Sequence, residues 1–249
     1  MLLLIHKPSG ITSHDAISAV KKYLRQPARD ALTEQEKSAG IKPPKIKIGH
    51  AGTLDPLASG LMIAATDKDT KLLHSLTGSD KTYETTIDFS QRSDTRDLDY
   101  RKLLEPIDPS MYEDIPPLSQ IEEILDTLIG TPSLPLTPFS AKKFEGKKLY
   151  EYAREGKPIF LTIPMTIYGY KVLDYQFPLL KLKLHVGSGT YIRSIGHWLG
   201  TQIGGDAILI SLKRISIGDH SLDFFEQKTI HIAQWDDKKI EYVILGDII

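Results

Sequence analysis

Residues 180–186 alternate strictly between apolar and polar side chains. Four apolar residues are separated by three polar ones, in the order Leu180, Lys181, Leu182, Lys183, Leu184, His185, Val186. Successive side chains of a β-strand point to opposite faces, so this period of two predicts a sheet with one packed face and one wet face. A chain with such a strand must provide partner strands and cover only one of its faces.

Helical and strand patterns follow one another without a regular strand-helix-strand repeat. Apolar spacing predicts helices at residues 13–24, 70–76, 121–130, 149–156 and 191–203. Short apolar or alternating runs predict strands at residues 1–5, 61–65, 81–89, 163–172 and 214–217. We therefore expect an α+β fold in which helices and loops flank a mixed or antiparallel central sheet.

Residues 26–44 are polar and contain three prolines and a glycine, which predicts a mobile, exposed insertion. Charge is also unevenly distributed around this stretch: residues 21–47 hold eight Lys and Arg against three Asp and Glu, although the whole chain has a net charge of -1. This bias indicates either a basic binding face or a solvated surface without a partner, and both interpretations stay open.

The composition excludes several classes of protein. The chain has no cysteine, which rules out disulfides, a thiolate nucleophile and a Cys-ligated metal. It has no apolar run long enough to span a bilayer, and the apolar opening of five residues is too short for a signal peptide. We expect a cytoplasmic protein without a membrane role.

The segment of residues 47–60 differs from the rest of the chain in its glycines. It reads Lys-Ile-Gly-His-Ala-Gly-Thr-Leu-Asp-Pro-Leu-Ala-Ser-Gly. Glycine permits backbone conformations and close approaches that other residues do not, and Pro56 stiffens the chain directly after Asp55. On these grounds alone Asp55 is either a turn former or a catalytic carboxylate held on a shaped loop.

This segment resembles the signature of the TruB family, Gly-His-x-Gly-x-Leu-Asp-Pro-x-Ala-x-Gly. Four further blocks resemble the family in the same order, so that the likeness covers roughly residues 1–218. They are Lys-Pro-Ser-Gly-Ile-Thr-Ser at 7–13, Asp-Lys-Thr-Tyr at 80–83, the pair of blocks at 140–146 and 149–156, and Gly-Thr-Tyr-Ile-Arg at 189–193. The resemblance implies a pseudouridine synthase fold and an enzyme that isomerises uridine at tRNA position 55, in the TΨC loop. It implies neither cofactor nor metal.

The resemblance also implies three catalytic residues. Asp55 corresponds to the essential aspartate, which acts as nucleophile or as general base on a flipped-out nucleotide. Tyr83 corresponds to the tyrosine that stacks on the target base. Arg193 corresponds to the arginine that keeps the carboxylate of Asp55 ionised and oriented.

Further residues are implied in substrate binding. His50 corresponds to a histidine that contacts the RNA while the nucleotide flips; no other histidine lies at metal-ligand spacing from it. Tyr191 corresponds to a family residue in the wall of the active site, and Leu212 corresponds to an apolar family residue that lines the pocket for the base. Lys7 and Lys143 are expected to bind substrate, the latter within basic clusters that follow the phosphates.

The expected domain organisation is a catalytic domain over residues 1–218, including the insertion at 26–44, and a short extension over 219–249 that is no full PUA-type RNA-binding domain. We therefore expect the catalytic domain to recognise the TΨC stem-loop by itself, with help from the insertion. The expected partner is tRNA, with no protein partner, and the protein is expected to be a monomer.

The chain departs from the family pattern in some places. Asp67 and Asp69 stand where small residues are usual, and residues 93–100 differ from a Thr-Asp-Thr-x-Asp stretch that normally ends in Gly. Two alternatives to the enzyme are a tRNA-binding or tRNA-folding protein with lost or secondary catalysis, and a hydrolase acting on small nucleosides. The hydrolase is disfavoured because no motif provides a second catalytic carboxylate.

Overall fold

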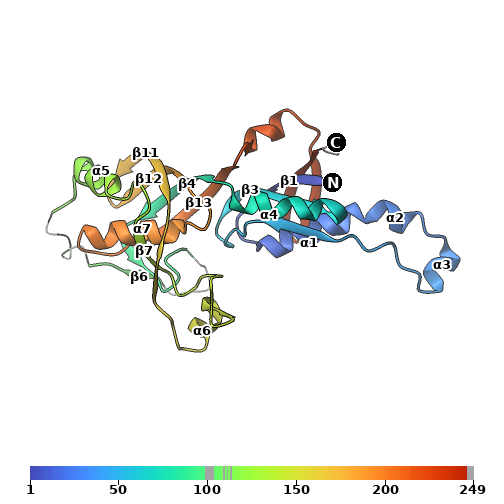
Figure 1. Ribbon diagram of the computed structural model, residues 1–249, viewed down its shortest axis with the longest axis horizontal. Coiled ribbons are helices and arrows are strands. Elements are labelled where there is room, and N and C mark those ends of the chain that lie inside the picture. The colour runs from blue at the N-terminus through green and yellow to red at the C-terminus, as the bar shows by residue number, and fades with distance from the viewer. Residues whose placement is uncertain (99–103, 109, 111, 113, 246–249) are drawn as a thin grey trace. The chain divides into compact units, whose positions relative to one another are not determined.

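The computed structural model describes residues 1–98, 104–108, 110, 112 and 114–245 (Figure 1). Close contacts divide the chain into two compact units. Unit 1 combines Met1–Ser79 with Arg214–Ile249, and unit 2 is Asp80–Lys213. In the part of the chain that the structure describes, no helix has the length and apolarity needed to cross a membrane.

Unit 1 contains a sheet in the order β13, β3, β1, β16, β15, in which β2 also pairs with β3 and β14 with β13. Its strands are β1 (Leu2–Lys7), β2 (Ile48–Ala51), β3 (Ser59–Thr66), the end of β13 (Ile208–Ile217), β14 (His220–Ser221), β15 (His231–Trp235) and β16 (Lys238–Leu245). Its helices are α1 (Ser13–Leu24), α2 (Gln26–Asp30), α3 (Glu34–Ser38), η1 (Asp67–Leu72), α4 (Leu73–Gly78) and η3 (Leu222–Glu226).

Strand β1 occupies the middle of this sheet because it is apolar on both faces. It pairs antiparallel with β3 and β16, so that Leu4 lies opposite Ile63 on one side and Val243 on the other. Leu2 and Leu4 belong to a core cluster against which Leu73 and Leu76 of α4 pack. Helix α1 contacts β1, β15 and β16. The predicted strand at residues 1–5 is confirmed.

Helix α1 begins where the sequence predicts. Thr12 caps it: the Thr12 side chain accepts a hydrogen bond from the Asp15 backbone at 3.1 Å, and the Asp15 carboxylate accepts one from the Thr12 backbone at 3.0 Å. This capping box satisfies donors that a helix start would otherwise leave unpaired. Ala16, Ile17 and Val20 then face the interior, as their spacing predicts.

Residues 26–44 are only in part the irregular loop that their composition suggests, because two short helices form within them and residues 39–44 belong to no helix or strand. The chain forms the short helices α2 and α3 directly after α1 (Figure 1). Helix α3 has its own capping box between Thr33 and Glu36, a local signal outweighed in the prediction by the prolines and glycine. Neither helix has a buried residue. The segment is therefore an exposed insertion, as expected, but a partly helical one.

Unit 2 is built on a sheet in the order β11, β12, β4, β13. Its strands are β4 (Lys81–Asp88), β5 (Gln91–Arg92), β6 (Glu105–Pro106), β7 (Ser133–Leu136), β8 (Lys143–Phe144), β9 (Lys147–Lys148), β10 (Leu161–Pro164), β11 (Ile167–Gln176), β12 (Leu179–Val186) and the start of β13. Its helices are α5 (Leu118–Asp126), α6 (Leu149–Arg154) and α7 (Ile192–Gln202).

The alternating segment forms β12, between β11 and β4, and pairs antiparallel with both. The apolar residues of the segment at 180–186 are buried, while Lys181, Lys183 and His185 are exposed. This confirms the predicted sheet with one packed face and one solvent-exposed face. The strand predicted at residues 163–172 is in fact two strands. β10 ends at Pro164, which has no backbone N–H with which to continue a ladder, and β11 begins at Ile167.

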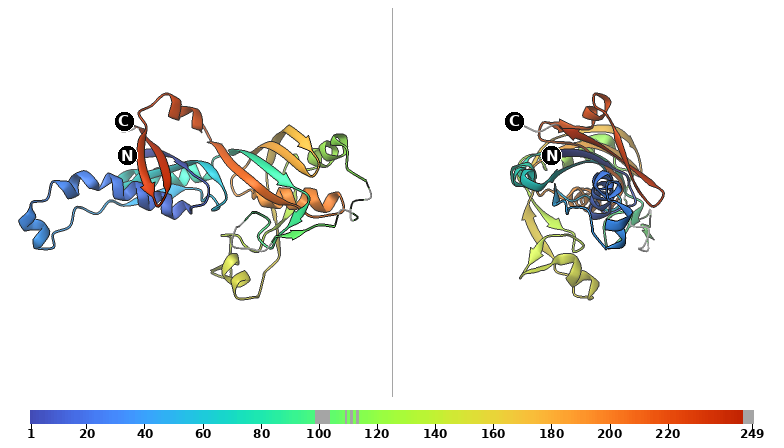
Figure 2. Two further views of the ribbon diagram at one scale, coloured as in Figure 1. Left: turned by 180° about the vertical axis from the view of Figure 1, so that it is seen from behind. Right: turned by 90° about the vertical axis from the view of Figure 1, so that its right-hand side faces the viewer.

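The C-terminal stretch is more closely integrated than an extension would be. β16 pairs antiparallel with β1, and β15 pairs with β16, as Figure 2 shows for the red and dark blue strands. Phe225 and Val243 from this stretch belong to the core cluster of unit 1. The unit boundary therefore does not follow the expected division at residue 218, since residues 219–245 help to build the sheet of unit 1; residues 246–249 lie outside the described part.

Candidate active site

Asp55 lies on the loop between β2 and β3 and is half-buried. The neighbouring residue Leu54 is held by Ser13, whose hydroxyl accepts from the Leu54 backbone N–H at 2.8 Å and donates to the Leu54 carbonyl at 2.9 Å. On the other side of Asp55, the Gly10 N–H donates to the Pro56 carbonyl at 2.8 Å. The block at residues 7–13 is therefore the support of the Asp55 loop.

Lys7 lies beneath the same loop with no exposed surface. Its ammonium donates to the carbonyls of Ile11 at 2.7 Å, Pro8 at 3.0 Å and Pro56 at 3.4 Å. Burial lowers the pKa of Lys7 to about 8, against the opposing effect of the negative charge of Asp55. This burial contradicts the expected direct contact between Lys7 and substrate, because the ammonium is enclosed by backbone carbonyls.

Arg214 is a further residue at this loop that the sequence reasoning missed. Its side chain is only 1% exposed, and its guanidinium donates to the carbonyls of Leu61 at 2.7 Å and Gly52 at 3.0 Å. The sequence signal was its spacing: Arg214 follows Leu212 by two residues. Because side chains two residues apart in a strand lie on the same face, Arg214 is expected on the inward face with Leu212. Arg214 thus fixes one end of the glycine-bounded loop from a strand far away in the sequence.

The last glycine of the loop permits this arrangement. Gly60 has a φ of +108°, and a Cβ built on it would lie 2.3 Å from the backbone oxygen of Arg214. Only a residue without a side chain fits a contact this close.

His50 lies on β2 and is half-buried. Burial lowers the pKa of His50, and the cation of Arg214 lowers it further. The imidazole is therefore neutral at pH 7. Its Nδ1 atom is buried and has no hydrogen-bond partner among the described residues. Contact between His50 and RNA stays a prediction.

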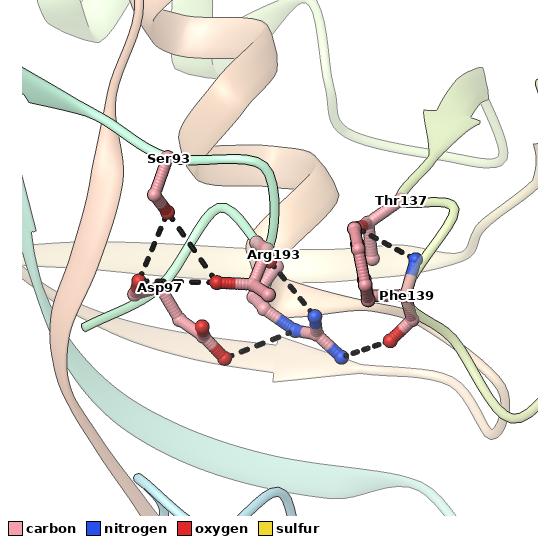
Figure 3. A network of polar contacts seen from close by, with 6 residues as sticks. Ser93, Asp97, Thr137, Phe139 and Arg193 are labelled. Atoms are coloured by element: carbon pink, nitrogen blue, oxygen red, sulfur yellow. Dashed lines mark hydrogen bonds and ion pairs between the residues drawn. The ribbon is translucent and has the colours of Figure 1, made fainter. Parts of the chain in front are cut away.

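Arg193 lies in the first turn of α7 in unit 2 and is 5% exposed, so it is not the surface residue that its position alone would suggest. Figure 3 shows its guanidinium at the centre of a polar network. It donates to the carbonyls of Thr95 at 2.9 Å and Phe139 at 3.3 Å, and its Nε lies 3.7 Å from the carboxylate of Asp97. Asp97 is itself 6% exposed.

Asp97 is the second residue that the sequence reasoning missed. A sequence signal for Asp97 was present. Residues 93–97 read Ser-Asp-Thr-Arg-Asp, which resembles the family stretch Thr-Asp-Thr-x-Asp, and Asp97 is the last aspartate of that stretch. The Ser93 hydroxyl donates to the Asp97 backbone carbonyl at 3.0 Å and so shapes the turn that presents it (Figure 3). A buried guanidinium with a buried carboxylate and two carbonyls is fixed in orientation, as a catalytic or substrate-positioning arginine requires.

The other predicted residues of unit 2 lie on α7 and on neighbouring strands. Tyr83 on β4 and Leu212 on β13 are each 8% exposed, and the two strands are adjacent in the sheet. Tyr191 is the N-cap residue of α7 and is half-buried. Tyr191 and Arg193 thus come together at the start of one helix, whereas Tyr83 and Leu212 come from the sheet.

Lys143 is exposed on β8, which forms a hairpin with β9. Glu145 and Gly146 at its tip both have positive φ, as a tight two-residue turn requires. On the second strand, the ammonium of Lys147 lies 4.7 Å from the ring centre of Tyr152 in α6. The hairpin presents Lys143 to solvent, where a phosphate contact is accessible; that contact stays a prediction.

Within the described residues, then, unit 1 groups Asp55 with Lys7, His50 and Arg214, and unit 2 carries the remaining predicted residues around α7, β4, β13 and the hairpin. No group of three or more His, Asp or Glu side chains in the described ranges is arranged to hold a metal ion.

Comparison with solved structures identifies the class of fold. A structure of an H/ACA ribonucleoprotein bound to a substrate RNA containing 2′-deoxyuridine aligns with a TM-score of 0.56 and 21% identity, over 89% of this chain and 49% of that one. The archaeal Nop10–Cbf5 complex aligns with a TM-score of 0.55, over 89% of this chain and 50% of that one. The chain thus spans about half the length of these structures and has the pseudouridine synthase fold.

Sequence comparison then defines the family. Residues 37–192 match the model of the TruB family pseudouridylate synthase, N-terminal domain. The tRNA pseudouridine synthase B of Caldicellulosiruptor saccharolyticus is 34% identical over 100% of this chain and 77% of its own length. That of Parabacteroides distasonis is 33% identical over 94% of this chain and 96% of its own length. The chain belongs to the TruB family of pseudouridylate synthases.

Proposed function

We propose that this protein isomerises a uridine of tRNA to pseudouridine, at position 55 in the TΨC loop. The support is membership of the TruB family, together with relatives that carry the name tRNA pseudouridine synthase B and are similar over nearly the whole chain. The observation that carries the proposal is the rigid presentation of Asp55, whose two neighbours in sequence are both held by the block at residues 7–13.

The reaction breaks the bond between ribose C1′ and N1 of the base and forms a bond between C1′ and C5. N1 gains a proton and C5 loses one, so that atoms balance without an oxidant or a water. A carboxylate suits either way of starting this exchange: it can add to an electrophilic carbon or it can remove a proton from one. Asp55 is the carboxylate that we assign to this step, as nucleophile or as general base.

Tyr83 and Arg193 are assigned to the same reaction. The Tyr83 ring stacks on the target base, and its hydroxyl lies near the proton that moves. We assign to Arg193 the positive charge that keeps the reacting carboxylate ionised; the support is that its buried guanidinium is held in a fixed orientation by the carbonyls of Thr95 and Phe139.

The remaining residues are assigned to binding. His50 and Tyr191 receive the flipped nucleotide, and Leu212 packs against the base. Lys143 contacts phosphate. For Lys7 we propose a positioning role in place of substrate contact, because its ammonium holds the Pro56 carbonyl next to Asp55.

The test is an assay of pseudouridine in an unmodified tRNA transcript. The wild-type protein should form pseudouridine at one site, and Asp55→Asn should lower the rate by roughly 10²- to 10⁴-fold or abolish it. Asp219→Asn, an exposed aspartate of the same unit, is the matched control and should keep full activity.

Two outcomes would contradict the proposal. If Asp55→Asn retained wild-type activity, the assigned carboxylate would be wrong. If the wild-type protein bound tRNA tightly but formed no product, the protein would be a tRNA-binding or tRNA-folding protein instead. A cytoplasmic monomer remains our expectation, and sedimentation of the purified protein tests the monomer.

A further inference from the structure

Unit 1 contains a strongly basic cavity away from the Asp55 loop. It has a volume of about 630 Å³ and lies between the end of α1, α2, α3 and the chain that returns through residues 40–43. Six of its lining residues are cationic, and none is Asp or Glu. They are Lys21, Lys22, Arg25, Arg29, Lys37 and Lys42. We call this cavity the basic hollow.

One of these cations builds the wall of the hollow. The guanidinium of Arg25 donates to the carbonyls of Pro43 at 3.0 Å and Pro44 at 3.2 Å, which ties the returning chain to the end of α1. Because backbone carbonyls carry no net charge, the positive charge of Arg25 is not neutralised by these contacts. The insertion is thus closed into a hairpin whose inner side is lined by cations.

The acidic residues of the insertion are engaged elsewhere. Glu36 caps α3 through Thr33, and Asp30 accepts from the Gln26 side chain at 2.7 Å. Glu34 pairs with Lys37 at 2.7 Å. Among the described residues, no carboxylate lies within ion-pair distance of Lys21, Lys22, Arg29 or Lys42. These four cations repel one another, and a bound polyanion would relieve that repulsion.

The hollow and the Asp55 loop are connected by one helix. Ser13 at the start of α1 holds Leu54, and the last turn of α1 lines the hollow. At about 1.5 Å per residue, the two ends of this 12-residue helix are about 18 Å apart. The lining residues run from Ser18 to Arg25, about 8 to 18 Å along the helix axis from Ser13, so a ligand in the hollow lies at a set distance from the Asp55 loop.

We infer that the basic hollow binds the phosphodiester backbone of the substrate tRNA, about 8 to 18 Å along α1 from Ser13, the residue that holds the Asp55 loop. This inference rests on the proposed function, because tRNA is the polyanion that the protein would meet at that loop. The lining contains cations but no aromatic side chain on which a base could stack, so the contact is to phosphate and is independent of sequence. A concave site suits a nucleic-acid strand better than a flat bilayer surface.

The experiment compares two variants that each lose four charges. The hollow variant carries K21Q, K22Q, R29Q and K42Q, and leaves Arg25 and Lys37 in their contacts. The control variant carries K68Q, K71Q, K228Q and K239Q, four exposed lysines of the same unit outside the hollow. Thermal melting confirms that both variants are folded, which we expect because α2 and α3 bury no residue.

The readouts are the Kd for unmodified tRNA transcript over a salt series and the rate of pseudouridine formation. In the hollow variant the Kd should rise at least tenfold relative to the control variant. If all four cations contact phosphate, the slope of log K against log salt should become shallower by about 3.6, since each lost phosphate contact removes about 0.9. The kcat at saturating tRNA should stay within about twofold of wild type, because none of these residues contacts the reacting nucleotide.

Equal affinities and salt slopes in the two variants would overturn the inference. So would a selective loss of binding to vesicles that contain phosphatidylserine, with tRNA binding unchanged, since this would assign the hollow to a membrane surface. The proposed function is tested by a different readout. A wild-type protein without pseudouridine activity would contradict the proposed enzymatic function. A difference in tRNA affinity between the two variants would still support tRNA binding in the basic hollow.

Discussion

The ammonium of Lys7 is enclosed beneath the Asp55 loop, and its pKa of about 8 lies well below the usual value for lysine because of burial. Below pH 8 Lys7 is charged in both the folded and the unfolded chain. Burial of this charge then lowers the free energy of unfolding by its full amount. As the pH rises above 8, the folded chain loses this proton first, and the unfolded chain binds more protons. The free energy of unfolding therefore rises with pH up to the unfolded pKa of 10.5.

We expect the wild-type protein to gain about 2 kcal/mol of stability relative to Lys7→Met between pH 7.5 and pH 9.5. Urea unfolding of both proteins at the two pH values measures this difference. The pH range lies below the ionisation of Tyr112, Tyr170 and Tyr242, whose pKa values burial raises to about 12. Lys68→Met, at an exposed lysine, should follow the wild-type curve; parallel curves for Lys7→Met and wild type would contradict the burial of a charged Lys7.

At the scale of elements, Gly60 determines how closely β3 and β13 approach each other. A Cβ at this position would lie 2.3 Å from the oxygen and 2.7 Å from the nitrogen of the Arg214 backbone. Neither atom can move without displacing β13, and with it the guanidinium that holds Gly52. The last glycine of the signature is therefore required by the packing of two strands, in addition to its φ of +108°.

Gly60→Ala should lower the free energy of unfolding by about 2–5 kcal/mol, because it combines a strained backbone with overpacking. Gly40→Ala is the matched control, since Gly40 also has a positive φ, of +75°, but has no atom within 4 Å of the added Cβ. The control should lose only about 1–2 kcal/mol from strain. Denaturant unfolding distinguishes the two, and equal losses would mean that the strands are free to separate at Gly60.

At the scale of the whole molecule, the net charge of -1 conceals an uneven distribution. Residues 21–47 hold eight Lys and Arg against three Asp and Glu, and six of these cations line the basic hollow. Binding of an RNA by such a surface releases counterions, so affinity depends on local charge and on salt more than on the overall sum.

We expect the affinity for tRNA to fall by about 10³-fold or more between 50 and 200 mM salt, as for proteins that contact six or more phosphates. The melting temperature should change little over this range, since few of the described ion pairs are buried. Equilibrium binding and thermal melting in the same buffers measure both. An affinity insensitive to salt would contradict a phosphate-based interface and leave contacts to bases as the main source of binding.

The sequence by itself determined those features that depend on neighbours along the chain. The helix at residues 13–24 follows from its cap and its apolar spacing. Strand β12, with one buried and one exposed face, follows from its alternating sequence, and the candidate loop follows from the glycines around Asp55. Such features are predictable because caps, periods and turns are set by residues a few positions apart. The helices α2 and α3 show the limit of this reasoning, since opposing local signals in residues 26–44 concealed them.

Only the tertiary structure decided which residues distant in sequence come together within each unit. Arg214 reaches Gly52 across 162 positions, Arg193 reaches Thr95 across 98, and β16 pairs with β1 from the far end of the chain. Lys7 was predicted from its motif to contact the substrate, but in the structure its ammonium is enclosed by backbone carbonyls. The physical reason is that burial and pairing depend on which segments the folded chain packs together, and no local pattern specifies that packing.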